Sequence, residues 1–379
     1  MALSLNLPDL LACVQSARAA FRAYLPGANA WAWPNNVAPS AKVIGAAQWQ
    51  GYQHLDYAAR QAFALFAEGK NLDIQGNMLN LPRKLAAASA GNVLITVSGA
   101  AAMAAGGQIQ RADNTLYTAT GPASTASAGV LTVPVLGPAG LAYNTAENTP
   151  MTIVSGLTGV GATGATAAVD SSGLTGGLDI EPDGEPETRD LSTYRGRILF
   201  RKANPPQGGA PADYVQWAGE VTGVTRVFVE RRWAGAGTVR VFPIFDQLFA
   251  STGGIADGAH IALVADLIAP LAPAGANVAF AAPVAQPVSV AISNLSPSTA
   301  AAQAAVLAEI ADAFQMYGRV SGSDAAVASM PYLASPFSML ADWIEGAVRD
   351  APGVIGADVS VADTAISEGC IPTPSVTFS

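Results

Sequence analysis

Charge is what this sequence has least of. Of its 379 residues only 12% are Asp, Glu, Lys or Arg, while half are hydrophobic, so the charged share is about half the usual one. Such a chain is neither disordered nor heavily solvated, and a surface so poor in charge favours a protein that lies in a permanent complex. The net charge of −9 argues against a nucleic-acid partner, which would need a basic surface.

Cysteine and histidine are scarce as well. Cys13 and Cys370 lie near opposite ends of the chain, with no spacing for a metal site or a disulfide scaffold. His54 and His260 each stand alone, so a Ser-His-Asp relay or a His-rich metal site would lack its neighbours. We therefore expect no catalytic residues, no metal and no cofactor, and we predict that the protein is not an enzyme.

One acidic loop is the exception that needs an interpretation. Asp179, Glu181, Asp183 and Glu185 alternate along the chain, a pattern compatible with paired glycosidase carboxylates or with a bound cation. The spacing lacks the bidentate Glu that completes an EF-hand loop. The favoured interpretation is an exposed loop that pairs with the neighbouring arginines or with a partner subunit.

Long apolar stretches are also absent, although one segment resembles a membrane span in length. No charge occurs between Lys84 and Arg111, which would suffice for a span of about 20 residues. The segment is interrupted by Gly, Ser, Thr and Asn, and its apolar members are mostly Ala. We expect strands and turns here and no membrane span, and no secretory signal is visible at the N-terminus.

The beginning of the chain is predicted to form a helical arm. From residue 7 to residue 24 apolar residues recur every three or four positions, as in an a/d helical seam. The seam consists of Leu7, Leu10, Val14, Ala17, Phe21 and Tyr24. Pro8 and Asp9 suit the start of a helix. A helix this short must pack on something, either its own domain or an intermolecular helical bundle.

A second helix is expected from Ser40 to Glu68, with Gly69 as its stop and a length of about 43 Å. It has apolar residues on two faces. One face carries Ile44, Leu55, Ala58, Ala62 and Leu65, and the other carries Trp49, Tyr52, Phe63 and Phe66. A helix that is apolar on two sides is buried between two bodies, which favours a bundle arm. Residues 71–90 are expected to form a hinge.

The remainder is predicted to alternate in character. Between residues 91 and 169 runs of β-branched residues end at Gly or Pro, which predicts a β-rich domain. A helix is expected from Asp190 to Lys202. Further on, Ser296-Pro297 and Ser335-Pro336 each look like the opening of a helix, and the residues after Gly353 form a strand pattern. The stretch 211–229 has the same order of Pro-opened helix, Gly-Val and strand, which suggests two α/β modules.

The most informative stretch runs from residue 176 to residue 245. It opens with a Gly-Gly-x-Asp-x-Glu turn and continues with an acidic run, an Arg-rich helix and a Gly/Pro loop. It then carries Ala-Asp-Tyr-x-x-Trp-Ala at 212–218, Gly223-Val224, a strand, and Gly-x-Gly-Thr-Val-x-Val at 235–241. We expect residues 235–237 to form a hairpin turn, with glycine supplying positive φ. In this order the string resembles the baseplate J-like family, the wedge proteins of contractile phage tails and related injection machines.

An earlier stretch supports the resemblance, and two places depart from it. The family's Leu-Asp-x-x-Gly, with a following Arg and an Ala-rich entry, matches Leu72, Asp73, Gly76, Arg83 and residues 86–88. The AWAWPNN insertion at 30–36 has no counterpart that we can place. Leu178 stands where a small or polar residue is usual. Both departures concern local loop conformation more than function.

The resemblance implies a structural, non-enzymatic baseplate wedge subunit, located in the virion tail and assembled in the host cytoplasm. Such subunits pair with a second copy of themselves and with a tail-protein-I-like wedge subunit through N-terminal helices, and they adjoin a lysozyme-like wedge or sheath-adaptor protein. Their C-terminal parts meet neighbouring wedges in a ring around the hub. The main alternative is a secreted or surface β-rich adhesin or receptor-binding protein, which would share the Gly- and Thr-rich strands and the acidic pI.

The predicted fold is therefore an α+β multidomain chain with a helical arm, a small β-domain and two α/β modules. The expected parts are a bundle-forming arm at 1–85, a β-rich domain at 86–172, the signature module at 173–250 and a ring-contact module at 251–379. The interface candidates are Leu10, Val14, Phe21, Trp49, Phe63, Arg231 and Arg232. For the two arginines, surface salt bridging is the competing interpretation.

Overall fold

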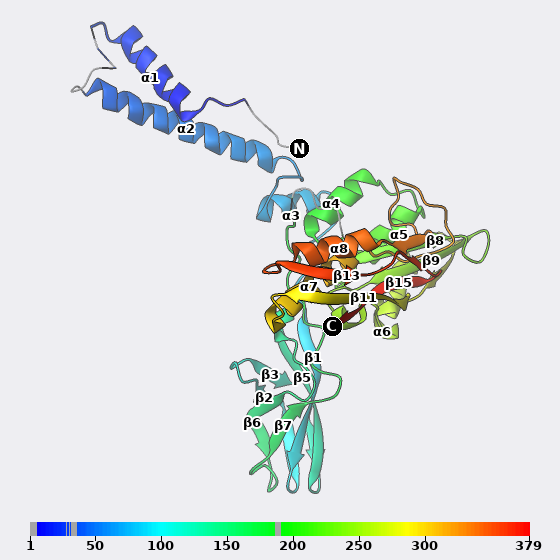
Figure 1. Ribbon diagram of the computed structural model, residues 1–379. Helices are drawn as coiled ribbons and strands as arrows, with labels where there is room; N and C mark the ends of the chain where they lie inside the picture. The colour runs from blue at the N-terminus through cyan, green and yellow to red at the C-terminus, as the bar shows by residue number, and fades with distance from the viewer. Residues whose placement is uncertain (1–5, 28, 30, 32–35, 186–190) are drawn as a thin grey trace. The chain divides into compact units, whose positions relative to one another are not determined.

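The computed structural model describes residues 6–27, 29, 31, 36–185 and 191–379 (Figure 1). The chain divides into two compact units. The first contains residues 1–82 and 183–188, and the second contains residues 83–182 and 189–379. Most of the AWAWPNN insertion and the first residue of the predicted 190–202 helix lie outside the described residues.

The first unit is built from three helices, α1 (Leu10–Tyr24), α2 (Val37–Gln61) and α3 (Gly69–Asn77). Asp9 caps α1, because its Oδ1 accepts a hydrogen bond from the backbone N–H of Ala12 at 2.7 Å. The predicted second helix is too long: α2 ends at Gln61, and Gly69 opens α3 instead of stopping α2. Residues 62–68 separate the two helices, and Glu68 is extended. Gly69 therefore marks the start of α3 and not the end of α2.

Helices α1 and α2 lie side by side (Figure 1) and bury a seam of small residues. The buried members are Cys13, Val14 and Ala17 on α1, and Ala38, Ala41 and Gly45 on α2. A Cβ atom on Gly45 would lie 2.6 Å from the Cα of Val14. Only glycine therefore permits this close an approach of the two backbones.

A seven-stranded sheet in the second unit has the order β3-β5-β1-β7-β6-β2-β4. The strands are β1 (Ala88–Val97), β2 (Ala101–Gln110), β3 (Leu116–Ala119), β4 (Ala123–Thr125), β5 (Gly129–Ala139), β6 (Pro150–Thr158) and β7 (Thr166–Val169). Its core includes Val93, Ile95, Ile109, Tyr117 and Val133. The charge-free segment forms all of β1 and β2. In the part of the chain that is described no helix is long and apolar enough to cross a membrane.

The signature stretch builds a smaller, three-stranded sheet with the order β10-β9-β8. Its elements are α4 (Tyr194–Ala203), α5 (Pro211–Ala218), β8 (Arg226–Arg231), β9 (Thr238–Ile244), α6 (Gly258–Ile268) and β10 (Asn277–Phe280). Strands β8 and β9 form an antiparallel hairpin, and Gly235 and Gly237 in its turn have φ of 107° and 81°. The hairpin turn predicted at 235–237 is confirmed. Because β10 pairs parallel to β9, this sheet continues past residue 250.

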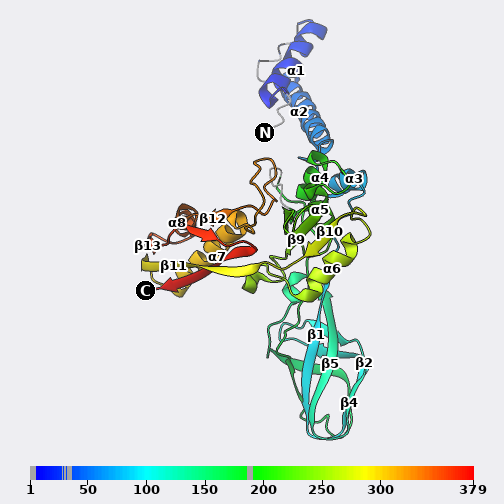
Figure 2. The ribbon, with the colours of Figure 1, turned by 90° about the vertical axis from the view of Figure 1, so that its right-hand side faces the viewer.

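A second three-stranded sheet has the order β13-β11-β15, with β11 antiparallel to β13 and parallel to β15 (Figure 2). The elements of this region are β11 (Val284–Ser296), α7 (Ala300–Tyr317), β12 (Phe337–Met339), α8 (Ala341–Asp350), β13 (Gly356–Ser360), β14 (Thr364–Ile366) and β15 (Cys370–Phe378). Its core includes Val290, Ile310, Phe314, Ile344 and Val348.

Both Ser-Pro pairs were assigned wrongly as helix openings. Helix α7 is capped by Thr299, whose Oγ1 accepts a hydrogen bond from the N–H of Ala302 at 3.2 Å, and Ser296 still belongs to β11. Ser335-Pro336 precedes the strand β12, and α8 begins only after Leu340. In both places a short extended segment intervenes, which the Ser-Pro signal alone does not reveal.

The internal similarity has a counterpart in the structure. Helix α5 leads through Gly223-Val224 to β8, and α8 leads through Gly353-Val354 to β13. Both glycines have positive φ, of 91° and 79°. Each strand so reached is an edge strand antiparallel to the central strand of its sheet.

Candidate assembly surfaces and the signature segment

The helical arm exposes its large apolar residues and buries its small ones. Ile44, Leu55 and Phe63 are 50–56% exposed, and Val43 is 70% exposed. Large side chains such as these stabilise a protein by about 1.5–3 kcal/mol each when they are fully buried. Within the described residues nothing covers them, so the arm presents an apolar surface on more than one side.

The predicted interface residues of the arm separate into two groups. Val14 lies in the seam between α1 and α2 and is buried. Leu10, Trp49 and Phe63 are exposed, and Phe21 is half-buried. The predicted a/d seam is thus only partly the seam that the hairpin uses, because Cys13 takes a buried place and Leu10 and Tyr24 do not.

The signature motif at 212–218 closes the Gly/Pro loop that precedes it. The buried carboxylate of Asp213 accepts hydrogen bonds from three backbone N–H groups, those of Gln207, Gly209 and Ala210, at 2.7–3.2 Å. A carboxylate is the side chain that can accept several such bonds at once. Asp213 therefore fixes the loop to the first turn of α5.

The aromatic and glycine positions of the signature serve the core. Tyr214 is 1% exposed and packs edge-on against Trp217 with 5.1 Å between the ring centroids. At Gly223 a Cβ would lie 2.7 Å from the Cδ1 of Leu248 and 3.4 Å from the Cδ1 of Leu178. Leu178, the departure from the family pattern, is buried beside this glycine. The signature thus describes a packing arrangement and carries no array of reactive groups.

The acidic loop is also occupied within the chain. Glu181 forms a buried ion pair with Arg197, with 2.7 Å between Oε2 and Nη1, and the same Oε2 accepts the N–H of Lys84 at 3.0 Å. Asp179 accepts the N–H of Leu141, and Asp183 accepts the N–H of Gly69. The expectation of an exposed loop is wrong for Glu181, which is 5% exposed. The segment that follows the β-rich domain packs against α4, where Glu181 meets Arg197.

Lys84 shares this buried cluster and has an altered acidity. Its Nζ donates to the backbone oxygen of Val224 at 3.2 Å. The pKa of Lys84 is lowered to about 7, chiefly by burial and secondly by the charge of Arg197, while Glu181 and Glu220 act in the opposite direction. Burial likewise raises the pKa of Glu220. Lys84 precedes the β-rich domain and Glu181 follows it. The cluster therefore holds the chain on both sides of this domain against α4.

The two predicted interface arginines differ in their surroundings. Arg231 forms a bidentate pair with Asp324, with both N–O distances at 2.7 Å, and its backbone N–H donates to the same carboxylate. Arg232 is exposed at the start of the hairpin turn, with φ of 59°. The charge of Arg231 is therefore already compensated within the chain.

Glu230, which is not among the residues predicted from the sequence, is buried at the end of β8. Burial opposes its ionisation, but hydrogen bonds from Ser323 and Arg240 outweigh that effect and hold its pKa below the usual value. With Arg231 and Asp324 it ties β8 to the segment around residue 323. The sequence Glu-Arg-Arg at 230–232 does not by itself indicate which of the three residues faces inward.

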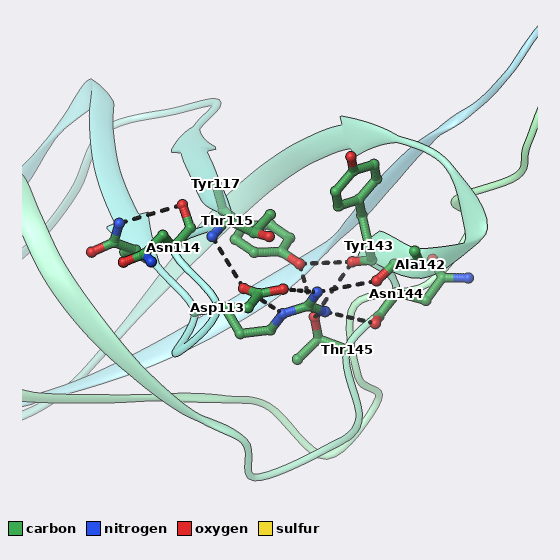
Figure 3. A network of polar contacts seen from close by, with 10 residues as sticks. Asp113, Asn114, Thr115, Tyr117, Ala142, Tyr143, Asn144 and Thr145 are labelled. Carbon is green, nitrogen blue, oxygen red and sulfur yellow. Dashed lines mark hydrogen bonds and ion pairs between the residues drawn. The ribbon is translucent and has the colours of Figure 1, made fainter.

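Arg111 plays a comparable part in the β-rich domain (Figure 3). Its guanidinium contacts the carboxylate of Asp113 and donates to the backbone oxygens of Ala142 and Asn144 and to Thr145 Oγ1, each at 3.1 Å. The hydrogen bond from Arg111 holds the pKa of Asp113 below its usual range. Two of the few charges in this domain therefore join the β2–β3 turn to the loop after β5.

Comparison with known proteins identifies the family of this chain. Residues 206–282 match the model of the baseplate J-like central domain. Baseplate protein gp47 of Escherichia phage Mu is 32% identical over 267 residues, which are 67% of this chain and 69% of that protein. The chain belongs to the baseplate J-like family.

Two further similarities accompany this one. The JayE protein of Escherichia coli strain K12 is 36% identical over 216 residues, which are 56% of this chain and 75% of that protein. Among solved structures, the six-fold symmetrised baseplate of the anti-feeding prophage has a TM-score of 0.39 and 11% identity, over 95% of this chain and 90% of that one. A similarity at this level does not establish a shared arrangement.

Family membership decides between the two functions considered from the sequence. The chain is a structural baseplate protein of a phage or phage-like tail. The alternative of a free adhesin rested on composition alone, and composition is shared by both classes.

Proposed function

We propose that this protein is a wedge subunit that pairs with a second copy of itself and with a tail-protein-I-like chain through its helical arm. The observation that carries the proposal is the inverted burial of α1 and α2, whose seam is made of small residues while Ile44, Leu55 and Phe63 are exposed. Two helices that bury so little between them gain most of their stability from a third and fourth helix.

The proposed layout follows from this role. Residues 1–85 would form the bundle arm, residues 86–172 the β-rich domain, the signature module would begin at 173, and the C-terminal module would contact neighbouring wedges. We count residues 251–280 with the signature module, because β10 completes its sheet. A lysozyme-like wedge or sheath-adaptor protein would be a further neighbour, in a structure assembled in the host cytoplasm and retained in the virion tail.

We propose a structural role without catalysis. In support, the acids of the loop at 179–183 each accept hydrogen bonds from backbone groups within their own unit. His260 lies against the side chain of Asp257, which caps α6, and its ring packs edge-on against Phe245 and Phe249. These contacts serve packing and capping.

Native mass spectrometry of the chain co-expressed with a tail-protein-I-like chain tests the arm. We expect two copies of this protein with one copy of the partner. The variant Leu10→Lys/Ile44→Lys/Leu55→Lys should lose this complex, because charged side chains would replace exposed apolar ones. Its far-ultraviolet circular dichroism should stay unchanged, since all three residues lie outside the α1–α2 seam.

Val160→Lys is the matched control, because Val160 is 84% exposed in the β-rich domain and should leave the complex intact. A complex that survives the triple variant would contradict the role of the arm. A chain that never binds the partner would contradict the wedge assignment as a whole.

A further inference from the structure

The two outer edges of the sheet β13-β11-β15 differ in their chemistry. Strand β15 carries Pro372 and Pro374, two residues apart, so the two missing N–H groups lie on the same side of the strand. Proline is accommodated in a sheet where that side faces away from the ladder. Strand β13 has neither proline nor lysine, and no strand of the described chain pairs with its outer side.

A groove runs along the unprotected edge. It has a volume of about 460 Å³ and lies between α8 and β13. On the helix it is lined by Glu345, Val348 and Arg349. On the opposite side it is lined by the consecutive residues 354–359, of which 356–359 belong to β13. Side chains alternate between the two faces of a strand, so consecutive residues can line one hollow only along the strand's edge.

The residues beside this groove leave room for another chain. Ile355 is 87% exposed at the beginning of the edge. A Cβ added at Gly346 on α8 or at Gly356 on β13 would meet nothing within 4 Å. Glycine inside a helix costs about 1 kcal/mol relative to alanine, and no contact within the chain requires it at position 346.

The direction of the free backbone groups can be read from β11. The oxygen of Ile292 accepts a hydrogen bond from Ser379, next to β15, so the backbone groups of Ile292 face that strand. Ile292 lies opposite Val359 in the antiparallel register. Residues directly opposite each other both face inward or both face outward. The N–H and C=O of Val359 therefore point to the open edge.

The rim of the groove is self-complementary in charge. Glu345 and Arg349 are four residues apart and line the same side of α8. In two copies related by a two-fold axis the α8 helices run antiparallel, so Glu345 of one copy faces Arg349 of the second copy, and the reverse. Such a contact is isologous, and an antiparallel strand pair obeys the same two-fold symmetry.

We propose that β13 pairs antiparallel with β13 of a second copy of this chain, which joins two sheets across the groove beside α8. The exposed backbone of an edge strand is best satisfied by another extended backbone, and the charge pattern of α8 selects a second copy. This inference rests on the proposed function in one respect, since it names the surface through which neighbouring wedges would meet.

The experiment uses the full chain carrying Leu10→Lys/Ile44→Lys/Leu55→Lys, so that association through the arm does not contribute. Sedimentation velocity over a range of concentrations should show a monomer–dimer equilibrium. Ile355→Lys should weaken the dimer at least about tenfold, because it places two lysines beside the shared edge. Val160→Lys is the matched control for an added charge and should leave the equilibrium unchanged.

Charge reversal distinguishes a two-fold contact from any other. Glu345→Arg alone and Arg349→Glu alone each put like charges face to face, and each should weaken the dimer. The double variant Glu345→Arg/Arg349→Glu restores opposite charges and should return the dimer to nearly its original affinity. In hydrogen exchange, the amide of Val359 should be protected in the dimer and exposed in the Ile355→Lys variant.

A chain that stays monomeric in the arm-variant background would overturn the proposal, as would a dimer that is insensitive to Ile355→Lys or not rescued by the double reversal. These outcomes are independent of the arm. Binding of the tail-protein-I-like chain by the unmodified protein tests the wedge assignment separately.

Discussion

The α1–α2 arm and the signature segment stabilise themselves in opposite ways. The arm buries Cys13, Val14, Ala17, Ala41 and Gly45 and exposes its large side chains. The signature segment buries large residues, among them Tyr194, Tyr214, Phe242 and Phe245, which are each 1% exposed or less. The first leaves large apolar side chains exposed, and the second is a core completed within the chain.

This difference indicates where each kind of residue acts. In the signature segment a change disturbs the fold of the chain itself, through lost packing or a lost ion pair. In the arm we expect a change at an exposed position to leave the chain folded and to disturb only the proposed association. The following predictions test that distinction, in order of decreasing effect on stability.

The largest effect is expected at the buried ion pair. Arg197→Met leaves the Glu181 carboxylate buried without its cation, and breaking a buried pair in this way costs about 3–5 kcal/mol. Chemical denaturation followed by tryptophan fluorescence measures it. The double variant Glu181→Leu/Arg197→Met removes both charges and should be less destabilised than Arg197→Met alone. Equal destabilisation of the two would contradict the cost of the unpaired charge.

A pH dependence should accompany the same cluster. Since the pKa of Lys84 is about 7 in the folded chain and ordinary when unfolded, the unfolded chain binds the extra proton between pH 7 and pH 10. The free energy of unfolding therefore rises with pH across this window, by at most about 1.4 kcal/mol per unit. Below about pH 7 the penalty is complete and this contribution to the slope vanishes.

The control is Lys84→Met, which has no group to titrate and should lose this part of the slope. The comparison is best made from pH 7 to pH 9.5, because burial raises the pKa of Tyr214 and Tyr332 and these groups affect stability above that range. A slope that is identical in the two proteins would exclude Lys84 as its source.

A smaller effect is expected in the arm seam. Gly45→Val places a side chain where even a Cβ would lie 2.6 Å from the Cα of Val14, and overpacking of this kind costs about 1–3 kcal/mol. The hairpin should open while the second unit keeps its melting temperature. Gly51→Val on the same helix is the control, because a Cβ there meets nothing within 4 Å. A hairpin that tolerates both changes equally would contradict the close seam.

The sequence allowed the edges of elements to be predicted where a cap or a turn has a local cause. Asp9 caps α1, and Gly235 and Gly237 form the β8–β9 turn, as the local pattern indicated. The exact extent of strand β2 has no such local cause, because its sequence AAMAAGGQIQ has almost no β-branched residues and its pairing with β6 and β3 decides its conformation. The two Ser-Pro pairs do not open helices, because Ser296 is the last residue of β11 and Ser335-Pro336 leads directly into β12.

The burial of charge was the least predictable property. Nothing in the alternation from Asp179 to Glu185 distinguishes Glu181, which is buried, from its neighbours, because its partners Lys84 and Arg197 are remote in sequence. The exposed faces of α2 were anticipated as apolar, but the choice of Cys13 and Gly45 for the hairpin seam depends on how closely two backbones approach. The periodicity of apolar residues does not indicate how closely the backbones of α1 and α2 approach each other.

The two ends of the β-rich segment lie side by side where it joins the rest of the second unit. Ala87 pairs with Leu178, and Ala90 pairs with Thr175, in reciprocal backbone hydrogen bonds. Paired residues in an antiparallel ladder have Cα atoms only about 4.5–5.5 Å apart. The stretch between them is thus a loop of more than eighty residues whose ends a short turn could join. A lineage could exchange or discard this whole appendage in one genetic event, without reshaping the chain on either side of it.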